Sequence, residues 1–197
     1  MPIDEKTSTT LLERVTASEP EAWARLVDLY GPIVYQRCRK AGLQEVDADE
    51  VFQEVFLTVS RSIGRFRRDR PGDSFRGWFS TITNTRILDF HRKQGRQVQA
   101  KGGSTAQVRL AQLPESTGDT SITDLPLGED GGLLRRALEL VRPRVSEQTW
   151  QACWRLLADD QRVADVAEEL GMTPRSVYDA KYRVMRMVRE EFGDLIE

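Results

Sequence analysis

The stretch that decides the fold is VADVAEELGMTPRSV, residues 163–177. Two short helical patterns flank Gly171, a residue that tolerates the positive backbone φ of a tight turn. Ala167 supplies the small side chain that is needed where two helices cross. Thr173 is placed to cap the second helix, and Pro174 stands at its first position, where no backbone N–H is required. Together these residues predict a helix-turn-helix.

The second helix of this motif has two different faces. Its inward positions carry apolar side chains at helical spacing, namely Val177, Ala180, Val184 and Met187. Its outward positions are rich in arginine and tyrosine, namely Arg175, Tyr178, Asp179, Tyr182, Arg183 and Arg186. Such a face suits a major groove, where arginine reads guanine and both residue types contact phosphate. A helical hairpin with a solvated charged face is the alternative, but the agreement of cap, turn and packing residues favours DNA binding.

Helical periodicity continues in both directions from this motif, and no strand-like alternation stands out. Trp150, Cys153, Trp154 and Leu157 predict a core beneath the motif. Apolar residues at three- and four-residue spacing predict further helices over residues 23–38, 51–63 and from Ser74 onward. Residues 97–132 break the pattern with Gly, Ser, Thr and Pro, which predicts a linker. We therefore expect an all-α protein with helical domains at 1–96 and 133–197, joined by a flexible acidic linker at 97–132.

The composition excludes several classes of protein. The chain has 197 residues, of which 39% are hydrophobic and 30% charged, as in ordinary soluble domains. No apolar run approaches the ~20 residues of a membrane helix, and the N-terminus has no apolar signal segment. We therefore expect a cytoplasmic protein without membrane insertion. Cys38 and Cys153 are the only cysteines, so neither a disulfide framework nor a metal site is expected, and no cofactor is implied.

Charge is distributed in blocks along the chain. Residues 1–60 carry 6 basic and 11 acidic side chains, whereas residues 61–101 carry 11 basic and 3 acidic ones. Residues 102–132 are acidic again, with 1 basic and 5 acidic side chains. The net charge of −2 therefore conceals separate surfaces that suit different partners.

Acidic residues gather at the start of the predicted helix before residue 63. Helix capping and the helix dipole explain Asp47 and Asp49, but Glu54 lies beyond the first turn. Four carboxylates, including Glu50, also suggest a metal-dependent nuclease. No matching acidic or histidine cluster completes such a site, so a protein-docking surface is the better interpretation.

A basic loop at residues 66–74 leads into an aromatic helix. Arginines attract phosphate, and aromatic rings offer platforms for unstacked bases. The apolar face of this helix carries Phe75, Trp78, Phe79 and Ile82, so most of its aromatic residues are predicted to be core. Ser80, Asn84 and His91 are expected on the opposite face. For His91, a phosphate or solvent contact is favoured over proton transfer.

At this point the sequence resembles the extracytoplasmic-function sigma factors of bacterial RNA polymerase. The resemblance covers about residues 10–96 and 133–192. It is carried by DEVFQEVF at 49–56, SFRGWF at 74–79 and DFHRK at 89–93. The order of the segments is as specific for this family as any of these motifs: acidic helix, basic loop, aromatic helix, tether, helix-turn-helix.

The resemblance implies a role for each predicted surface. Core RNA polymerase would be bound by Asp49, Glu50, Gln53 and Glu54. The opened −10 element of promoter DNA would be captured by Arg67, Arg68, Arg70, Asn84, Thr85, His91, Arg92 and Lys93. The duplex −35 element would be read by Arg175, Tyr178, Asp179, Tyr182, Arg183 and Arg186. An anti-sigma protein is a further partner that the resemblance implies.

The chain departs from the family pattern at three positions. The family commonly has Asn where Thr85 stands, and Asn84 lies one residue early, so either residue could contact the flipped base. Tyr178 and Asp179 occupy positions that are often Arg or Lys and Ser, which predicts an unusual promoter sequence. The sequence thus predicts a sigma factor without a catalytic site. The alternative is a stand-alone helix-turn-helix regulator that binds duplex DNA.

Overall fold

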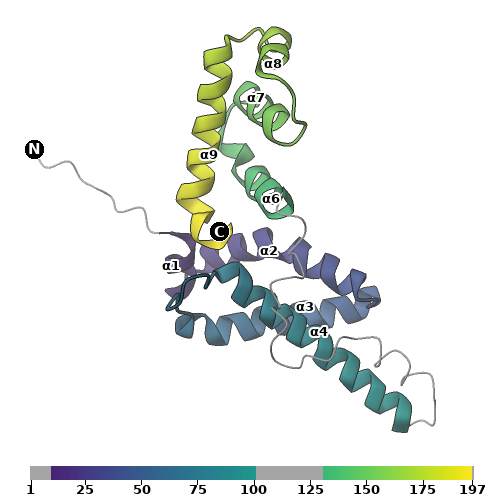
Figure 1. Cartoon of the computed structure of the whole chain (residues 1–197). Coiled ribbons are helices and arrows are strands. Elements are labelled where there is room, and N and C mark those ends of the chain that lie inside the picture. The colour runs from purple at the N-terminus through teal and green to yellow at the C-terminus, as the bar shows by residue number, and fades with distance from the viewer. Residues whose placement is uncertain (1–9, 101–130, 197) are drawn as a thin grey trace, which may run out of the picture. The chain divides into compact units, whose positions relative to one another are not determined.

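The computed structural model describes residues 10–100 and 131–196, and every regular element in these ranges is helical (Figure 1), which confirms the all-α expectation. The α-helices are α1 (Leu11–Thr16), α2 (Pro20–Lys40), α3 (Glu45–Ser62), α4 (Phe75–Ala100), α6 (Gly131–Val141), α7 (Glu147–Leu157), α8 (Val163–Glu169) and α9 (Pro174–Ile196). Two 3₁₀ turns, η1 (Ile63–Arg65) and η3 (Arg142–Arg144), follow α3 and α6. Within the described ranges, no helix is both long enough and apolar enough to cross a membrane.

The described residues form two compact units, and the division falls inside α2, between Tyr30 and Gly31. The first unit contains α1, the start of α2 and the helices α6 to α9. The second contains the rest of α2 with α3, η1 and α4. The expected domains at 1–96 and 133–197 follow the chain order instead, and they remain predictions about functional segments.

Helix α1 begins at a capping box that the sequence analysis overlooked. The hydroxyl of Thr10 accepts from the backbone N–H of Glu13, whose carboxylate accepts from the N–H of Thr10 at 2.9 Å. Leu11 and Val15 lie on the buried side of α1, which packs against α9. Removing such side chains from water contributes about 1.5–3 kcal/mol each. This short helix is therefore held mainly by its apolar contacts with the C-terminal helix.

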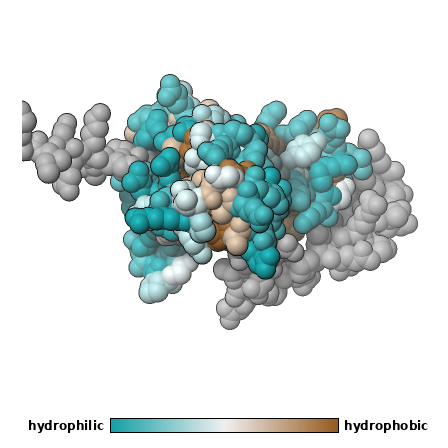
Figure 2. All heavy atoms as spheres, turned by 90° about the horizontal axis from the view of Figure 1, so that it is seen from above, coloured by the Kyte–Doolittle hydropathy of each residue, from teal (hydrophilic) through white to brown (hydrophobic). Residues whose placement is uncertain are grey.

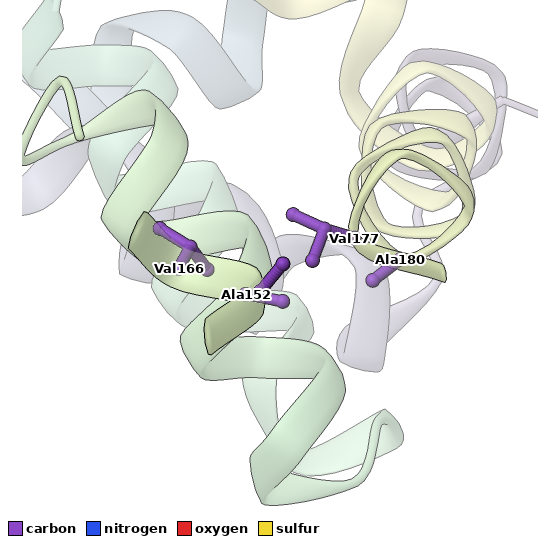
Figure 3. Close-up of a cluster of buried hydrophobic side chains, with 5 residues drawn as sticks. Ala152, Val166, Val177 and Ala180 are labelled. Atoms are coloured by element: carbon purple, nitrogen blue, oxygen red, sulfur yellow. The ribbon is translucent and has the colours of Figure 1, made fainter. Parts of the chain in front are cut away.

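The predicted helix-turn-helix is formed by α8 and α9. Gly171 has a φ of 61°, and the Thr173 hydroxyl accepts from the backbone N–H of Ser176 at 3.1 Å, so both the turn and the cap are confirmed. Figure 3 shows side chains of α7, α8 and α9 meeting in one small core. The cluster consists of Ala152, Val166, Ala167, Val177 and Ala180. Small residues let the three helices approach closely, as the sequence predicted for Ala167.

The second unit is built on α3 packed against α4. The predicted apolar period of α3 is confirmed by the burial of Val51, Val55 and Val59. In α4, Phe75 and Phe79 are fully buried, while Trp78 and Ile82 are half-buried. The ring of Phe66 lies 5.6 Å from that of Phe75 and 5.2 Å from that of Trp78, so the basic loop is anchored to the start of α4.

The structure differs from the sequence-based expectations in the end of one helix and in the burial of some core residues. Helix α4 continues to Ala100, four residues into the predicted linker, because nothing between residues 97 and 100 breaks a helix. Residues 101–130 of that linker lie outside the described residues. Trp154, Leu157 and Met187 are half-buried rather than fully buried core. Figure 2 shows a mainly hydrophilic face, and the large apolar side chains that stay exposed in the described ranges are Val46, Leu57, Tyr178 and Tyr182.

Candidate nucleic-acid interface

The outward face of α9 is exposed as the sequence predicted. Its members, Arg175, Tyr178, Asp179, Tyr182, Arg183 and Arg186, are all accessible to solvent. Tyr178 and Tyr182 keep 58% and 65% of their surface exposed, which is unusual for aromatic side chains. The opposite face holds Val177, Ala180 and Val184 in the core. One rigid helix therefore presents guanidinium and phenol groups together, a combination that suits base edges and phosphates.

The acidic face of α3 is also exposed. Beyond the first turn of the helix, four side chains are exposed to solvent, namely Asp49, Glu50, Gln53 and Glu54. Glu50 is engaged within the chain, because the Nζ of Lys93 lies 2.8 Å from its Oε1. This hydrogen bond and the charge of Glu50 raise the pKa of Lys93, and Glu54 adds a smaller effect. The predicted docking residues thus meet one predicted −10 residue on the surface of the second unit.

The basic loop before α4 displays its arginines. Arg67, Arg68 and Arg70 are exposed. The loop is closed by a backbone turn in which the N–H of Arg70 donates to the carboxylate of Asp73 at 2.9 Å. The Nη1 of Arg67 donates to the carbonyl of Phe66 at 2.8 Å, so this side chain lies back along the loop. A nucleic-acid phosphate would have to replace such weak, exposed contacts.

The polar side of α4 corrects one expectation. Ser80 and Asn84 do not lie away from the core: Ser80 is 4% exposed, and both residues face Arg37 of α2. The Nη1 of Arg37 donates to Ser80 Oγ at 2.8 Å and to Asn84 Oδ1 at 3.1 Å. Burial, with a smaller contribution from the charge of Arg76, lowers the pKa of Arg37 to about 10. Arg37 therefore stays protonated at neutral pH and fixes the orientation of the Asn84 amide.

Two polar atoms on α4 are left without partners among the described residues. They are Nδ2 of Asn84 and Nε2 of His91, both buried. Buried donors or acceptors are normally satisfied, and the sequence had expected His91 at a phosphate or in solvent. By contrast, Thr85 is exposed and its hydroxyl donates to the carbonyl of Thr81 at 2.8 Å. Within the described residues, Asn84 thus keeps a polar atom without a partner, whereas the Thr85 hydroxyl is already bonded within α4.

Arg92 lies on the exposed side of the same helix. Its Nη1 is 3.7 Å from the carboxylate of Asp89.

Arg37 is the residue of this region that could not be assigned a role from the sequence. A signal for it existed, since position 37 continues the apolar series through Tyr30 and Val34 and so falls on the buried face of α2.

Three comparisons bear on the identity of the chain. Residues 26–97 match the family model described as Sigma-70 region 2. The ECF RNA polymerase sigma factor SigE of Mycolicibacterium smegmatis is 31% identical over 116 residues, which is 58% of this chain and 39% of that protein. BldN, an ECF RNA polymerase sigma factor of Streptomyces coelicolor, is 24% identical over 185 residues, covering 93% of this chain and 65% of BldN.

RNA polymerase sigma factor CnrH of Cupriavidus metallidurans is 29% identical over 82 residues, covering 42% of this chain and 41% of CnrH. The chain thus spans less than two thirds of each of these relatives. Among solved structures, CnrH in complex with the cytosolic domain of CnrY shares 18% identity, with 90% of this chain and 92% of CnrH covered and a TM-score of 0.36. BldN in the RsbN–BldN complex shares 20% identity, with 90% and 96% covered and a TM-score of 0.36.

These findings define a helical protein that carries a sigma-70 region 2 domain. The chain is similar in sequence to extracytoplasmic-function sigma factors, which confirms the resemblance seen in the sequence.

Proposed function

We propose that this chain is a sigma factor, which binds core RNA polymerase and directs transcription initiation at specific promoters. The observation that carries the proposal is the combination of two features in one chain. A sigma-70 region 2 domain exposes acidic residues on α3, and a helix-turn-helix exposes arginines and tyrosines on α9. A stand-alone regulator would have no use for the first of these.

Each surface has a role under this proposal. Asp49, Glu50, Gln53 and Glu54 dock on a basic surface of core polymerase. The −10 element is captured and held open by Arg67, Arg68, Arg70, Asn84, Thr85, His91, Arg92 and Lys93. The −35 element is read by Arg175, Tyr178, Asp179, Tyr182, Arg183 and Arg186. The chain acts without a catalytic site of its own, and the cytoplasm is the compartment in which polymerase would meet it.

The arrangement of α4 supports the −10 role. Arg37 holds Oδ1 of Asn84, so the amide nitrogen is directed away from Arg37 and is a donor without a partner in the described residues. An extruded base presents acceptors that such a donor can bind once α4 adjusts. Regulation by an anti-sigma protein, which the family resemblance implies, remains a prediction.

The test is transcription in vitro from a library of genomic fragments. Core RNA polymerase alone is compared with core polymerase plus this chain. A small set of transcripts that depends on the added chain, with shared upstream elements, is the expected result. If the chain fails to co-elute with core polymerase but binds palindromic duplexes by itself, it is a stand-alone regulator instead.

A further inference from the structure

A hollow of about 380 Å³ lies in the first unit, beside the outward face of α9. Its lining includes Arg183 and Arg186 from α9, together with Arg144 and Ser146 from the junction of η3 and α7. Arg144 and Ser146 belong neither to the helix-turn-helix nor to the residues that the sequence assigned to DNA. The hollow therefore joins the predicted DNA-reading face to a second segment of the chain.

The lining of the hollow is net positive, with Arg186 paired to Glu190 and Arg144 paired to Glu191. Three guanidinium groups line it against the single carboxylate of Glu190. The side chains of Arg144 and Arg186 remain 51% and 59% exposed, so both can reorient towards a ligand. The side chain of Ser146 caps α7, whose first-turn amides add a positive end of a helix dipole nearby. This set of groups suits a phosphate, since guanidinium groups bind its oxygens in pairs.

We propose that this hollow binds a backbone phosphate of duplex DNA, with Arg144 and Arg183 as its principal contacts. The inference rests on the proposed function only in taking DNA as the ligand of α9. Because the ligand is a phosphate and not a base, the contact adds affinity without sequence preference. It adds Arg144, which lies outside the recognition helix, to the predicted DNA contacts, and it gives Arg183 of that helix a phosphate contact.

Arg144 also has a structural role that the test must separate. Its Nη1 lies 2.6 Å from Oε2 of Glu191, and Oε1 of the same carboxylate accepts from Nε of Arg25 at 2.8 Å. Glu191 is 15% exposed, so this network is partly shielded from water. A loss of binding in an Arg144 variant could arise from this network alone, and a variant of Glu191 distinguishes the two causes.

The experiment measures binding of the full chain to a short fluorescent duplex of arbitrary sequence, by anisotropy between about 50 and 200 mM salt. Each phosphate contact contributes about 0.9 to the slope of log K against log salt concentration. We expect Arg144→Ala and Arg183→Ala each to lower the slope by about this amount, equally for several unrelated duplexes. Arg189→Ala, which removes an exposed arginine of α9 that does not line the hollow, should leave the slope unchanged.

Glu191→Gln is the decisive comparison. If Arg144 binds phosphate, this variant keeps the full slope, because the guanidinium remains available. A Glu191→Gln variant that reproduces the loss of Arg144→Ala overturns the proposal, since the effect would then come from the ion-pair network. Circular dichroism of each variant checks that the helices are intact.

Two further arms identify the source of the phosphate. Inorganic phosphate added at constant ionic strength should compete weakly, because one free ion lacks the contacts that the rest of the duplex makes. If inorganic phosphate saturates the hollow while duplex binding stays unchanged, the duplex does not use the hollow and the assignment to DNA is overturned. So does an Arg144→Ala variant that loses affinity for core polymerase but not for duplex. Promoter-specific transcription with unchanged salt slopes rejects this inference alone, whereas altered slopes without such transcription reject the proposed function alone.

Discussion

At the scale of single residues, Gly171 is required for its backbone and not for its size. Its φ is 61°, and a Cβ added there would meet nothing within 4 Å. We therefore expect Gly171→Ala to lower the free energy of unfolding by roughly 1–2 kcal/mol, the cost of a left-handed residue with a Cβ. Urea denaturation followed by circular dichroism measures this change.

Gly193 is the matched control for that substitution. It also has open space around its Cβ position, but it lies within α9 without a positive φ. Gly193→Ala should stabilise the protein by about 0.4–1 kcal/mol, because it removes freedom from the unfolded chain. If both variants shift stability in the same direction, the backbone explanation of Gly171 is wrong.

The two cysteines give a prediction about pH. Both are buried, and burial raises the pKa of Cys38 and of Cys153 to about 11. In the unfolded chain a thiol loses its proton near pH 8.5, so the unfolded state binds fewer protons than the folded state between about 8.5 and 11. These thiols should therefore make stability fall as pH rises through that window.

The measurement is the denaturation midpoint of the wild type and of a Cys38→Ala/Cys153→Ala variant across this range of pH. The variant starts from a lower stability, because it leaves small cavities, but it should lose less on going to high pH. Parallel curves for the two proteins would show that the thiols do not contribute.

At the scale of elements, the cap of α9 links stability to the proposed reading of DNA. Thr173→Ala removes the acceptor for the N–H of Ser176, which lies 3.1 Å away, and should cost about 1 kcal/mol. The first turn of α9 carries Arg175, so fraying there should also weaken −35 binding. Thr173→Ser keeps the hydroxyl and should preserve both properties. Calorimetry and duplex binding of the two variants in parallel would check the link.

Most of the helices could be predicted from the sequence, because apolar periodicity and capping residues mark them. The turn at Gly171, the cap at Thr173 and the apolar rows of α3 and α9 depend on local rules, and the structure has all of them. Helix α1 was not predicted, because its six residues are too few for a periodic signal. Thr10 and Glu13, which form its capping box, were the signal that could have revealed it. Local patterns cannot show such a short helix unless its cap is considered.

The site could be predicted less completely than the elements, for a physical reason. Exposure of Arg183 or Glu54 follows from the helical wheel, because each helix has one buried face. The position of Asn84 depends on Arg37, which lies 47 residues earlier in the chain. No local pattern reveals that Arg37 of α2 will donate hydrogen bonds to two polar side chains of α4, Ser80 and Asn84. The same holds for Arg144 beside Arg183, which only the tertiary fold brings together.

At the scale of the whole molecule, the proposed docking on polymerase would depend on charge. Reversing Glu50 and Glu54 to Lys should weaken binding to core polymerase while the helices stay intact, because like charges then face a basic partner. Surface charges are worth little singly, so the double reversal is needed. Glu168→Lys, a charge reversal on α8 outside the predicted docking residues, is the control. If the double variant binds core polymerase like the wild type in a pull-down titration, the assignment of α3 as the docking surface is wrong.

The two DNA surfaces should act at different steps of initiation. Arg183→Ala should weaken the closed complex, whereas variants of Asn84, Thr85 or the loop from Arg67 to Arg70 should mainly reduce the open complex. A template with a mismatched bubble at the −10 element should restore transcription to the second group more than to Arg183→Ala. Permanganate footprinting on both templates measures this, and equal rescue of both groups would contradict the division of roles.

The first unit is assembled from segments at opposite ends of the sequence, and this affects how the chain can be divided. The hydroxyl of Tyr30 donates to the backbone carbonyl of Leu195, and Arg25 lies over the ring of Phe192 at 5.4 Å. A fragment that starts at residue 131 would keep the whole helix-turn-helix but lose α1 and these partners. The apolar residues at the end of α9 would then face water, and such a fragment would tend to self-associate. Supplied separately, a polypeptide of residues 10–100 should restore that cover, as complementary halves of a split protein do.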